Sequence, residues 1–283
     1  MHKNFNIKEI KTNFFYKVVK YKSPIKGKKV CILAGIHGDE IPSIIAVEEI
    51  LKEKSLYLLR GEIYFIIVNK KAIINNTRFI EKDLNRCFID KDNTNSHEEQ
   101  IAKELKKILD KCDISLDLHS TRKKSIPFII CEPNAYATIK NFPIDIVCSG
   151  FDSHQPGATD TYMNQNGKIG ICVESGYMRD KSSIPLAKDI IFIFLNELNM
   201  IEYKINHYTK KDYYTVTYMY KNKDDFKLIK KFENFERLKK GDPIGFDGKK
   251  KIVADDNNFI IFAQDRNKKN KDNEAFLLGY NIS

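Results

Sequence analysis

Hydrophobic and polar residues change their spacing repeatedly along the first two hundred residues. Residues 29–34 and 62–68 are continuous apolar runs, which are typical of short strands buried on both faces of a sheet. Residues 41–53 and 96–111 place apolar residues at helical spacing, and Ser96 has the position of an N-cap. The alternation continues to about residue 200, with strands expected at 113–120, 126–132, 143–150 and 167–175, a short helical piece at 135–140 and a helix at 182–201. It predicts an α/β domain whose mixed, largely parallel sheet is flanked by helices.

The pattern changes after about residue 205. Short period-2 runs, broken by Gly, Pro, Asn and Asp, replace the helical spacing and predict an all-β unit. Residues 239–246, with the sequence KKGDPIGF, are typical of a tight turn entering a strand in small barrel-sandwich modules. We therefore predict two domains, with residues 1–204 forming the α/β domain and residues 205–283 forming a small all-β, barrel-sandwich-like domain.

Length and composition indicate a globular protein. The chain has 283 residues, of which 42% are hydrophobic, enough for a buried core. The first twenty residues are interrupted by charge and lack the apolar core of a signal peptide. The apolar run at residues 190–195 is far shorter than the roughly 20 residues needed to cross a bilayer. We therefore expect a cytoplasmic protein with no membrane partner.

Charge and cysteine usage exclude two further classes. The net charge of +10 comes mostly from scattered lysines, and no DNA- or RNA-binding module accompanies it, so we do not expect a nucleic-acid partner. The six cysteines never form CxxC, and several lie in strand-like apolar runs. They are typical of buried thiols in a reducing compartment, and a thiolate zinc site is not expected.

Chemically active side chains follow four of the predicted strands. His37 and Glu40 follow the run ending at residue 34, Asn69 follows the next run, His119 closes a third and Glu174 closes a fourth. In an open α/β sheet, functional groups collect beyond the carboxyl ends of the strands. These side chains are therefore expected at one edge of the sheet.

His37, Glu40 and His119 form a candidate zinc site. A catalytic zinc site needs three protein ligands and one open position for water, and these residues supply that number. A glycine on each side of His37 relaxes the bend that turns both side chains toward one ion. Asp117, on the same face of the strand as His119, is a candidate acceptor for the other ring proton of a ligating histidine. Taken singly, an HxxE segment is more often a solvated loop, and a histidine at a strand end more often a structural residue.

The order of motifs resembles a known family. GxHGxE at residues 35–40 is followed by N..A.....R....DLNR.F at 69–88, DLH at 117–119 and VESG at 173–176. This order resembles the succinylglutamate desuccinylase and aspartoacylase family, a branch of the zinc carboxypeptidase clan. The resemblance covers about residues 28–200, and the trailing β unit also resembles the carboxy-terminal domain of that family. It implies a zinc-carboxypeptidase-like fold and one zinc ion per chain, held by the three candidate ligands.

The resemblance also implies roles for the remaining motif residues. Glu174 would be the general base and acid, while Arg78, Asn85 and Arg86 would hold the carboxylate of the substrate and polarise its scissile carbonyl, with Asn69 at the start of the same substrate-binding segment. These residue types suit that chemistry, because a carboxylate can move the proton of an attacking water and an arginine opposes a developing oxyanion. The alternatives are a helix-capping carboxylate for Glu174 and surface salt bridges for the two arginines.

One departure from the family concerns the second acidic group of the substrate. Aspartoacylase-type members carry an arginine in the loop before the base glutamate, whereas this chain has Asn164 and Gln165 there and no arginine between Arg122 and Arg179. Specificity for N-acetylaspartate is therefore not carried over. The residues considered as substitutes or as further substrate contacts are Arg122, His154, Tyr162, Lys168 and Arg179.

The leading hypothesis is a zinc-dependent hydrolase of a linear amide bond, which deacylates an N-acyl amino acid or a similar small amide. A second hypothesis keeps the chemistry but makes the chain a metallocarboxypeptidase acting on short or cell-wall peptides. A third, from another class, is a non-catalytic protein that binds an anionic partner. The sequence leaves open whether the chain forms a homo-oligomer.

Overall fold

The chain was analysed as a computed structural model, which describes residues 5–53, 56–89, 95–205, 210–270 and 272–283. The strands are β1 Asn6–Glu9, β2 Phe15–Lys22, β3 Lys29–Ala34, β4 Glu62–Asn69, β5 Ile114–Thr121, β6 Phe128–Cys131, β7 Ile146–Ser149, β8 Ile169–Tyr177, β9 Asp212–Lys221, β10 Phe226–Leu228, β11 Glu236–Leu238, β12 Pro243–Asp247, β13 Lys250–Val253, β14 Asn258–Ile261 and β15 Glu274–Asn281. The α-helices are α1 Ile41–Glu53, α2 Lys70–Ile74, α3 His97–Leu109, α4 Tyr136–Ile139, α5 Phe151–His154, α6 Thr159–Gln165 and α7 Ser183–Glu197. Short 3-10 helices are η1 Leu84–Arg86, η2 Pro133–Ala135 and η3 Lys268–Asn270.

A large mixed sheet runs through the molecule. Within the described residues its strand order is β1-β2-β4-β3-β5-β8-β6-β7-β9-β15-β14-β11. The four central strands β4, β3, β5 and β8 are parallel neighbours, so their carboxyl ends lie at one edge. Antiparallel pairing begins on either side, between β2 and β4 and between β6 and β8. Parallel pairing returns between β6 and β7 and between β7 and β9, so the sheet is mixed.

Helices cover both faces of the central strands. On one face, α1 and α7 pack with α4 over side chains such as Ile32 and Phe65. On the other face, α3 and Met163 of α6 pack over Leu33 and Ile66. Because alternate residues of β3 and β4 are buried by opposite layers, both strands are apolar throughout, as the sequence pattern indicates.

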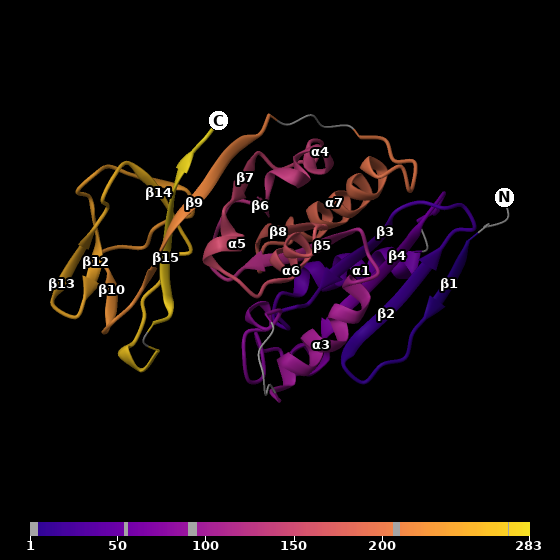
Figure 1. Cartoon of the computed structure of the whole chain (residues 1–283), viewed down its shortest axis with the longest axis horizontal. Helices are drawn as coiled ribbons and strands as arrows, with labels where there is room; N and C mark the ends of the chain where they lie inside the picture. Colours follow the sequence, from indigo (N-terminus) through magenta and orange to yellow (C-terminus); the bar gives the residue numbers. More distant parts are fainter. Residues whose placement is uncertain (1–4, 54–55, 90–94, 206–209, 271) are drawn as a thin grey trace.

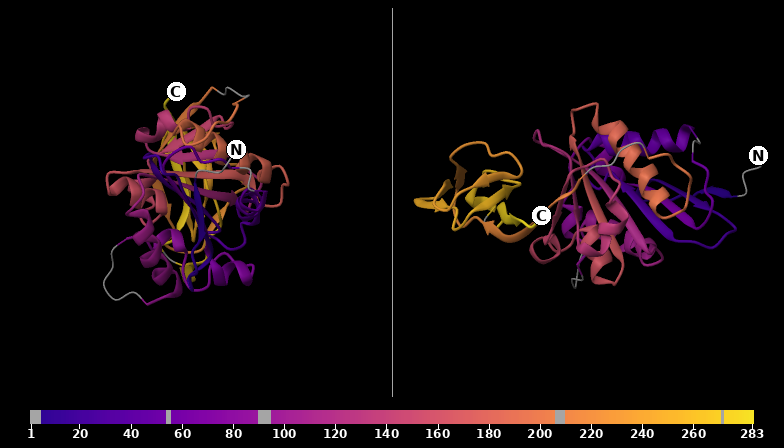
Figure 2. Two further views of the ribbon diagram at one scale, coloured as in Figure 1. Left: turned by 90° about the vertical axis from the view of Figure 1, so that its right-hand side faces the viewer. Right: turned by 90° about the horizontal axis from the view of Figure 1, so that it is seen from above.

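The strands from β9 onward lie to one side of the α/β part (Figure 1). β9 pairs with β7 in parallel and with β15 in antiparallel fashion, so the large sheet continues into this region. A second sheet, β10-β12-β13, packs there around a core that includes Phe226, Ile244 and Phe276. Figure 2 shows the same lateral position from above. Apolar side chains of both parts, among them Phe128 and Phe259, form a shared cluster between them.

Most expected elements of the α/β part are present. The strand at residues 29–34 has the expected bounds, and Ser96 caps α3 in a complete capping box with Glu99. The sequence pattern did not predict β1, α2, α5 or α6, and α6 occupies a segment that was expected to be a loop. Within the described residues, no helix combines the length and apolarity that crossing a membrane requires.

Candidate metal centre and active site

The edge formed by β3, β5 and β8 collects the predicted side chains. His37 and Glu40 lie in the turn that joins β3 to α1, and His119 and Glu174 are register partners on adjacent parallel strands. The turn packs so closely on α2 that a Cβ atom at Gly38 would lie 2.2 Å from the backbone carbon of Ala72. The glycine is therefore required by a close backbone approach, which holds His37 and Glu40 against the sheet.

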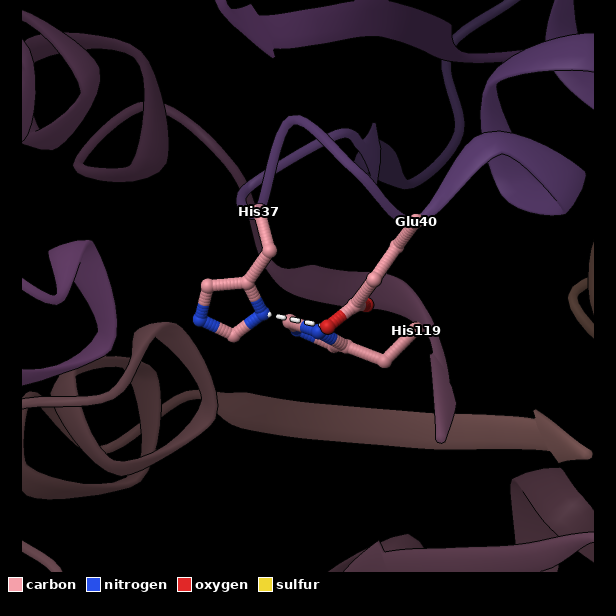
Figure 3. Close-up of side chains that lie close together, drawn as sticks. All are labelled: His37, Glu40 and His119. Carbon is pink, nitrogen blue, oxygen red and sulfur yellow. Dashed lines mark hydrogen bonds and ion pairs between the residues drawn. The ribbon is translucent and has the colours of Figure 1, made fainter. Parts of the chain in front are cut away.

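His37, Glu40 and His119 point toward one another (Figure 3) and are all buried. The carboxylate of Glu40 lies between the two imidazoles, with Oε1 2.7 Å from His37 Nδ1 and Oε2 2.9 Å from His119 Nδ1. The backbone N–H of Ser120 also donates to Glu40 Oε2, at 3.1 Å. One possible ligand atom from each residue lies within 4.8 Å of the others. The group thus has the number, type and proximity of ligands that a metal site requires.

The second nitrogen of each imidazole faces another carboxylate. His37 Nε2 lies 3.1 Å from Asp83 Oδ1, and His119 Nε2 lies 3.1 Å from Asp117 Oδ2. The Thr159 hydroxyl donates to Asp117 Oδ2 at 2.5 Å and fixes that carboxylate in turn. A carboxylate on Nε2 favours the tautomer in which this nitrogen carries the proton and Nδ1 keeps its lone pair for a metal.

The charge of the cluster suits a divalent cation. Three carboxylates contact the imidazoles, and the Arg78 guanidinium contacts two of these carboxylates. With neutral imidazoles, three negative charges and one positive charge leave a formal charge of −2 in a buried region. Buried charge is costly unless it is paired, and the −2 charge and the two Nδ1 atoms match one zinc ion. The side chains present therefore fit the metal that the sequence resemblance implies.

Arg78 connects the cluster to the loop that precedes α3. Its Nη1 donates to Glu40 Oε1 at 3.2 Å, and its Nη2 donates to Asp83 Oδ2 at 3.1 Å. Although burial opposes ionisation of Asp83, its hydrogen bond with His37 and the charge of Arg78 hold the pKa of that carboxyl well below its usual range. Asp83 therefore serves both the histidine and the arginine as an anion.

Glu174 lies beside this group with one carboxylate oxygen unpaired. Its Oε2 is enclosed and has no hydrogen-bond partner among the described residues. Burial, together with the negative charge of Glu40, raises the pKa of Glu174 from 4.5 to about 7. A carboxyl group with a pKa near neutrality can both accept and return a proton at physiological pH, which suits a general base and acid.

Asn85 and Arg86 follow Asp83 in a short 3-10 turn. The Asn85 amide Nδ2 lies 3.3 Å from His119 Nε2, so this side chain adjoins the cluster directly. Arg86 Nη1 donates to the Asn85 carbonyl at 2.8 Å, and its Nη2 lies 3.6 Å from Glu274 Oε2 at the start of β15. The C-terminal strands thus reach the candidate active site.

Four other expected contacts have different surroundings. Asn69 is fully buried, where its amide nitrogen donates to Glu98 and its amide oxygen caps α2. Tyr162 donates to Asp110 on the α3 side of the sheet, and Lys168 donates to the Leu109 carbonyl. Arg122 forms a two-nitrogen ion pair with Asp39.

His154 and Arg179 lie outside the group formed by His37, Glu40 and His119. His154 ends α5, and the next residue, Gln155, is the one whose amide donates to Glu274. Arg179 follows β8 at the surface. Within the described part of the chain, neither side chain forms a hydrogen bond or ion pair with His37, Glu40 or His119.

Two further carboxylates near the site were not identified from the sequence. Glu98 is fully buried at the start of α3 and binds the loop that follows Arg78 through the backbone N–H groups of Ile80, Glu81 and Lys82. Glu274 contacts Arg86 from a strand more than 180 residues away in the chain. A glutamate in the first turn of a helix indicates only a favourable interaction with the helix dipole. The sequence therefore contains no specific signal for the contact of Glu98, and none for the long-range contact of Glu274.

Comparison with known proteins places this geometry in a family. Residues 26–193 match the family model described as the succinylglutamate desuccinylase/aspartoacylase catalytic domain. The chain belongs to the succinylglutamate desuccinylase/aspartoacylase family. The motif resemblance is thereby confirmed, and it extends over more than half of the chain.

Relatives of this family cover most of the chain. A protein named succinylglutamate desuccinylase from Vibrio vulnificus is 24% identical over 88% of this chain and 80% of its own length. A protein named probable aspartoacylase from a Nostoc species is 28% identical over 77% of this chain and 84% of its own length. The crystal structure of succinylglutamate desuccinylase from Vibrio cholerae superposes with a TM-score of 0.80 at 21% identity, covering 97% of this chain and 90% of that one. This similarity confirms the mixed α/β fold.

Proposed function

We propose that the chain is a zinc-dependent amidohydrolase that removes the acyl group from an N-acyl amino acid or a similar small amide. One observation carries the proposal. His37, Glu40 and His119 meet in a buried group, and the second nitrogen of each imidazole faces a carboxylate. Membership of a family whose named relatives are desuccinylases and aspartoacylases supports deacylation as the reaction.

The proposed reaction adds water across a C–N amide bond. A zinc ion held by the three ligands would supply Lewis-acid activation of water near neutral pH. Glu174 would accept a proton from the attacking water and pass it to the nitrogen of the leaving amine. The products are a carboxylate from the acyl group and the free amine, so no other reactant is needed. The unpaired Oε2 and the raised pKa of Glu174 support this assignment.

The loop residues would bind and orient the substrate. Arg86 has the larger exposure of the two candidate arginines, and its guanidinium suits a carboxylate. Arg78 already contacts Glu40 and Asp83, so we propose that it fixes the ligand set and opposes developing negative charge nearby. Asn85, adjoining His119, would donate its amide to the scissile carbonyl region.

Metal content of the purified protein tests the ligand assignment. We expect about one zinc ion per chain in the wild-type protein, and loss of that ion in His119→Ala. His154→Ala serves as the matched control, because His154 lies outside the ligand group, and it should retain the metal. Equal zinc content in wild type and His119→Ala would contradict the assignment.

Hydrolysis of defined amides tests the reaction. N-acetyl and N-succinyl amino acids should be cleaved, and Glu174→Gln should lose at least about a hundredfold in kcat, as expected for removal of a general base, while keeping its zinc. Turnover of dipeptides alone would instead support a metallocarboxypeptidase. A protein without zinc that binds anions and releases them steeply with salt would support the non-catalytic alternative.

We also propose the division into residues 1–204 and 205–283. The core around Phe226, Ile244 and Phe276 consists of C-terminal residues, which supports a separate unit. The pairing of β7 with β9 and the shared cluster containing Phe128 and Phe259 bind this unit firmly to the α/β part. Expression of residues 1–204 alone, followed by circular dichroism and urea unfolding, tests whether that part folds independently.

A further inference from the structure

Three arginine guanidinium groups gather on the side of the candidate active site that faces β15. Arg78 and Arg86 come from the loop before α3, and Arg266 comes from the segment joining β14 to β15. Arg86 Nη2 lies 3.6 Å from Glu274 Oε2, and Arg266 Nε donates to the backbone carbonyl of the same Glu274. Glu274 therefore places Arg266 next to Arg86 across the boundary between the two parts of the molecule.

Arg266 is held firmly by its backbone and by one side-chain nitrogen. Its N–H donates to the Phe226 carbonyl at 2.9 Å, and its carbonyl accepts from the Phe226 N–H at 2.8 Å. The side chain is half-buried, and Nε is bonded to Glu274. Within the described residues no acceptor is recorded for its two terminal nitrogens. A fixed guanidinium with free terminal N–H groups is prepared to bind a planar anion.

The charge beside Glu274 is unbalanced toward the positive. Arg78 has the carboxylates of Glu40 and Asp83 as partners. Among the described residues the ion-pair partner of Arg86 is Glu274, and Arg266 contacts the backbone carbonyl of Glu274 and not its carboxylate. Two guanidinium groups beside the one carboxylate of Glu274 leave a formal charge of +1 there. Burial lowers the pKa of Arg266 against the opposing charge of Glu274, and the positive charges of Arg86 and Arg78 lower it further. An anionic ligand would relieve this repulsion.

The segment before β8 supplies no arginine to this region. It forms α6, where the Asn164 amide donates to Asp152 and its carbonyl oxygen accepts from the N–H of Gly170. Both polar atoms of the Asn164 side chain are therefore engaged in hydrogen bonds within the protein. Gln155, earlier in the same segment, donates to Glu274 and carries no charge. A cation for a second substrate carboxylate must therefore come from elsewhere, and Arg266 is placed to provide it.

We infer that Arg266 is a specificity-determining residue that binds a second carboxylate of the substrate, on the acyl chain or on the amino-acid side chain, beside the carboxylate held by Arg86. This inference rests on the proposed deacylase function. It gives the C-terminal part of the chain a role in substrate selection, since Arg266 lies in the segment joining β14 to β15 and Glu274 begins β15.

Three nearly isosteric substrates test the inference. N-butyryl-norvaline carries one carboxylate, N-succinyl-norvaline adds one on the acyl chain, and N-butyryl-glutamate adds one on the amino-acid side chain. We expect the wild-type enzyme to prefer one of the two dicarboxylates, which identifies the source of the second carboxylate. Arg266→Gln should lower kcat/KM for that compound by roughly 10- to 150-fold, mainly through KM, because a charge-assisted hydrogen bond is lost. Its kcat/KM for N-butyryl-norvaline should stay within about threefold.

Two further variants separate specificity from folding. Arg237→Gln, an exposed arginine on β11, is the matched control and should keep the wild-type preference. Arg266→Lys retains the charge without the planar fork and should restore part of the preference, which also keeps the test usable if Arg266→Gln is poorly folded. Melting temperatures of all variants are compared with that of wild type.

The outcomes distinguish this inference from the function on which it rests. A wild-type enzyme that cleaves all three compounds equally would overturn the role of Arg266, as would an Arg266→Gln variant that loses activity equally on all three. Failure of the zinc-loaded wild-type protein to cleave any N-acyl amino acid would overturn the proposed deacylase function itself.

Discussion

Glu98 binds the loop between Arg78 and Asp83 through both of its carboxylate oxygens, and replacing it with glutamine should release that loop. Oε1 accepts from the Ile80 N–H at 2.8 Å and from the amide of Asn69 at 3.2 Å. Oε2 accepts from two further backbone N–H groups, each at 3.1 Å. In Glu98→Gln one oxygen becomes an NH2 group, which cannot accept, so two donors lose their partner whichever way the amide is turned.

The magnitude follows from the two lost bonds. Hydrogen bonds to a charged group contribute about 1.5 to 3 kcal/mol each, so the loss is about 3 to 6 kcal/mol if the loop stays in place. Residues 80–82 are exposed, however, and their N–H groups can turn to water once the loop opens. We therefore expect a loss of about 1 to 3 kcal/mol in the free energy of global unfolding, with the remainder appearing as opening of the loop.

Opening of the loop would displace Arg78 and Asp83, which contact Glu40 and His37. A loss of about 3 kcal/mol in transition-state stabilisation corresponds to a fall of roughly 150-fold in kcat/KM. Hydrogen exchange at residues 80–82, urea unfolding and amide hydrolysis measure the three effects separately. Glu104→Gln is the matched control on the same helix, because Glu104 forms a surface pair with Lys107 that is worth a few tenths of a kcal/mol.

The pH dependence gives an independent check. Although burial opposes it, the hydrogen bonds from the loop lower the pKa of Glu98 from 4.5. Glu98 therefore contributes stability that is present above the unfolded-state pKa and is lost as the pH falls through the lower folded-state pKa. The stability difference between wild type and Glu98→Gln should shrink below about pH 4.5. Unchanged hydrogen exchange at residues 80–82 together with unchanged activity would refute the reasoning.

Three further substitutions test other parts of the structure. Burial and, after it, the negative charge of Asp152 raise the pKa of Asp160 from 3.8 to about 7. As the pH rises from 3.8 to 7, the unfolded chain ionises at Asp160 while the folded protein does not, so the free energy of unfolding falls. Asp160→Asn should accordingly stabilise the protein by about 2 to 3 kcal/mol more at pH 8 than at pH 5 in urea unfolding, and an equal effect at both pH values would contradict the shift. Gly38→Ala should lower both zinc content and stability, the latter by about 1 to 3 kcal/mol, because its Cβ would lie 2.2 Å from the backbone of Ala72; normal zinc binding would exclude the clash. Ser96→Ala should cost about 1 kcal/mol in urea unfolding through loss of the N-cap, and an unchanged midpoint would show that the cap contributes little.

The central strands, and the gathering of His37, Glu40 and His119 at one edge, could be predicted from the sequence because the cause of each strand is local. Residues 29–34 are buried on both faces, which requires an uninterrupted apolar run, and the run ends at Gly35, whose φ of +68° suits a turn. Once β3, β5 and β8 are parallel neighbours, their carboxyl ends must share an edge. The place of His119 at this edge then follows from topology, and the close approach of Gly38 to Ala72 brings His37 to the same edge.

Helix α6 could not be predicted because its cause is not local. Its sequence, TDTYMNQ, lacks the apolar spacing of a surface helix, and its buried side chains include Thr159, Asp160 and Thr161. Its position depends on contact with β8, where Gly170 leaves room for the backbone of Asp160: a Cβ atom there would lie 2.2 Å from the Asp160 carbonyl oxygen. Tertiary packing, and not local helix propensity, therefore determines that this segment is helical.

Residues 78–86 show why the conformation of the rest of the site could not be predicted from the sequence. The motif order identified this segment but not its conformation, which is fixed by carboxylates from three distant places. Glu40 binds Arg78, Glu98 binds the backbone of residues 80–82, and Glu274 contacts Arg86. Because each contact joins groups that are far apart in the sequence, the spacing of residues along the chain does not predict it. It follows that replacing Glu98 in α3 or Glu274 in β15 should lower substrate turnover, as substitutions in the segment itself should, although neither residue is a predicted metal ligand or base.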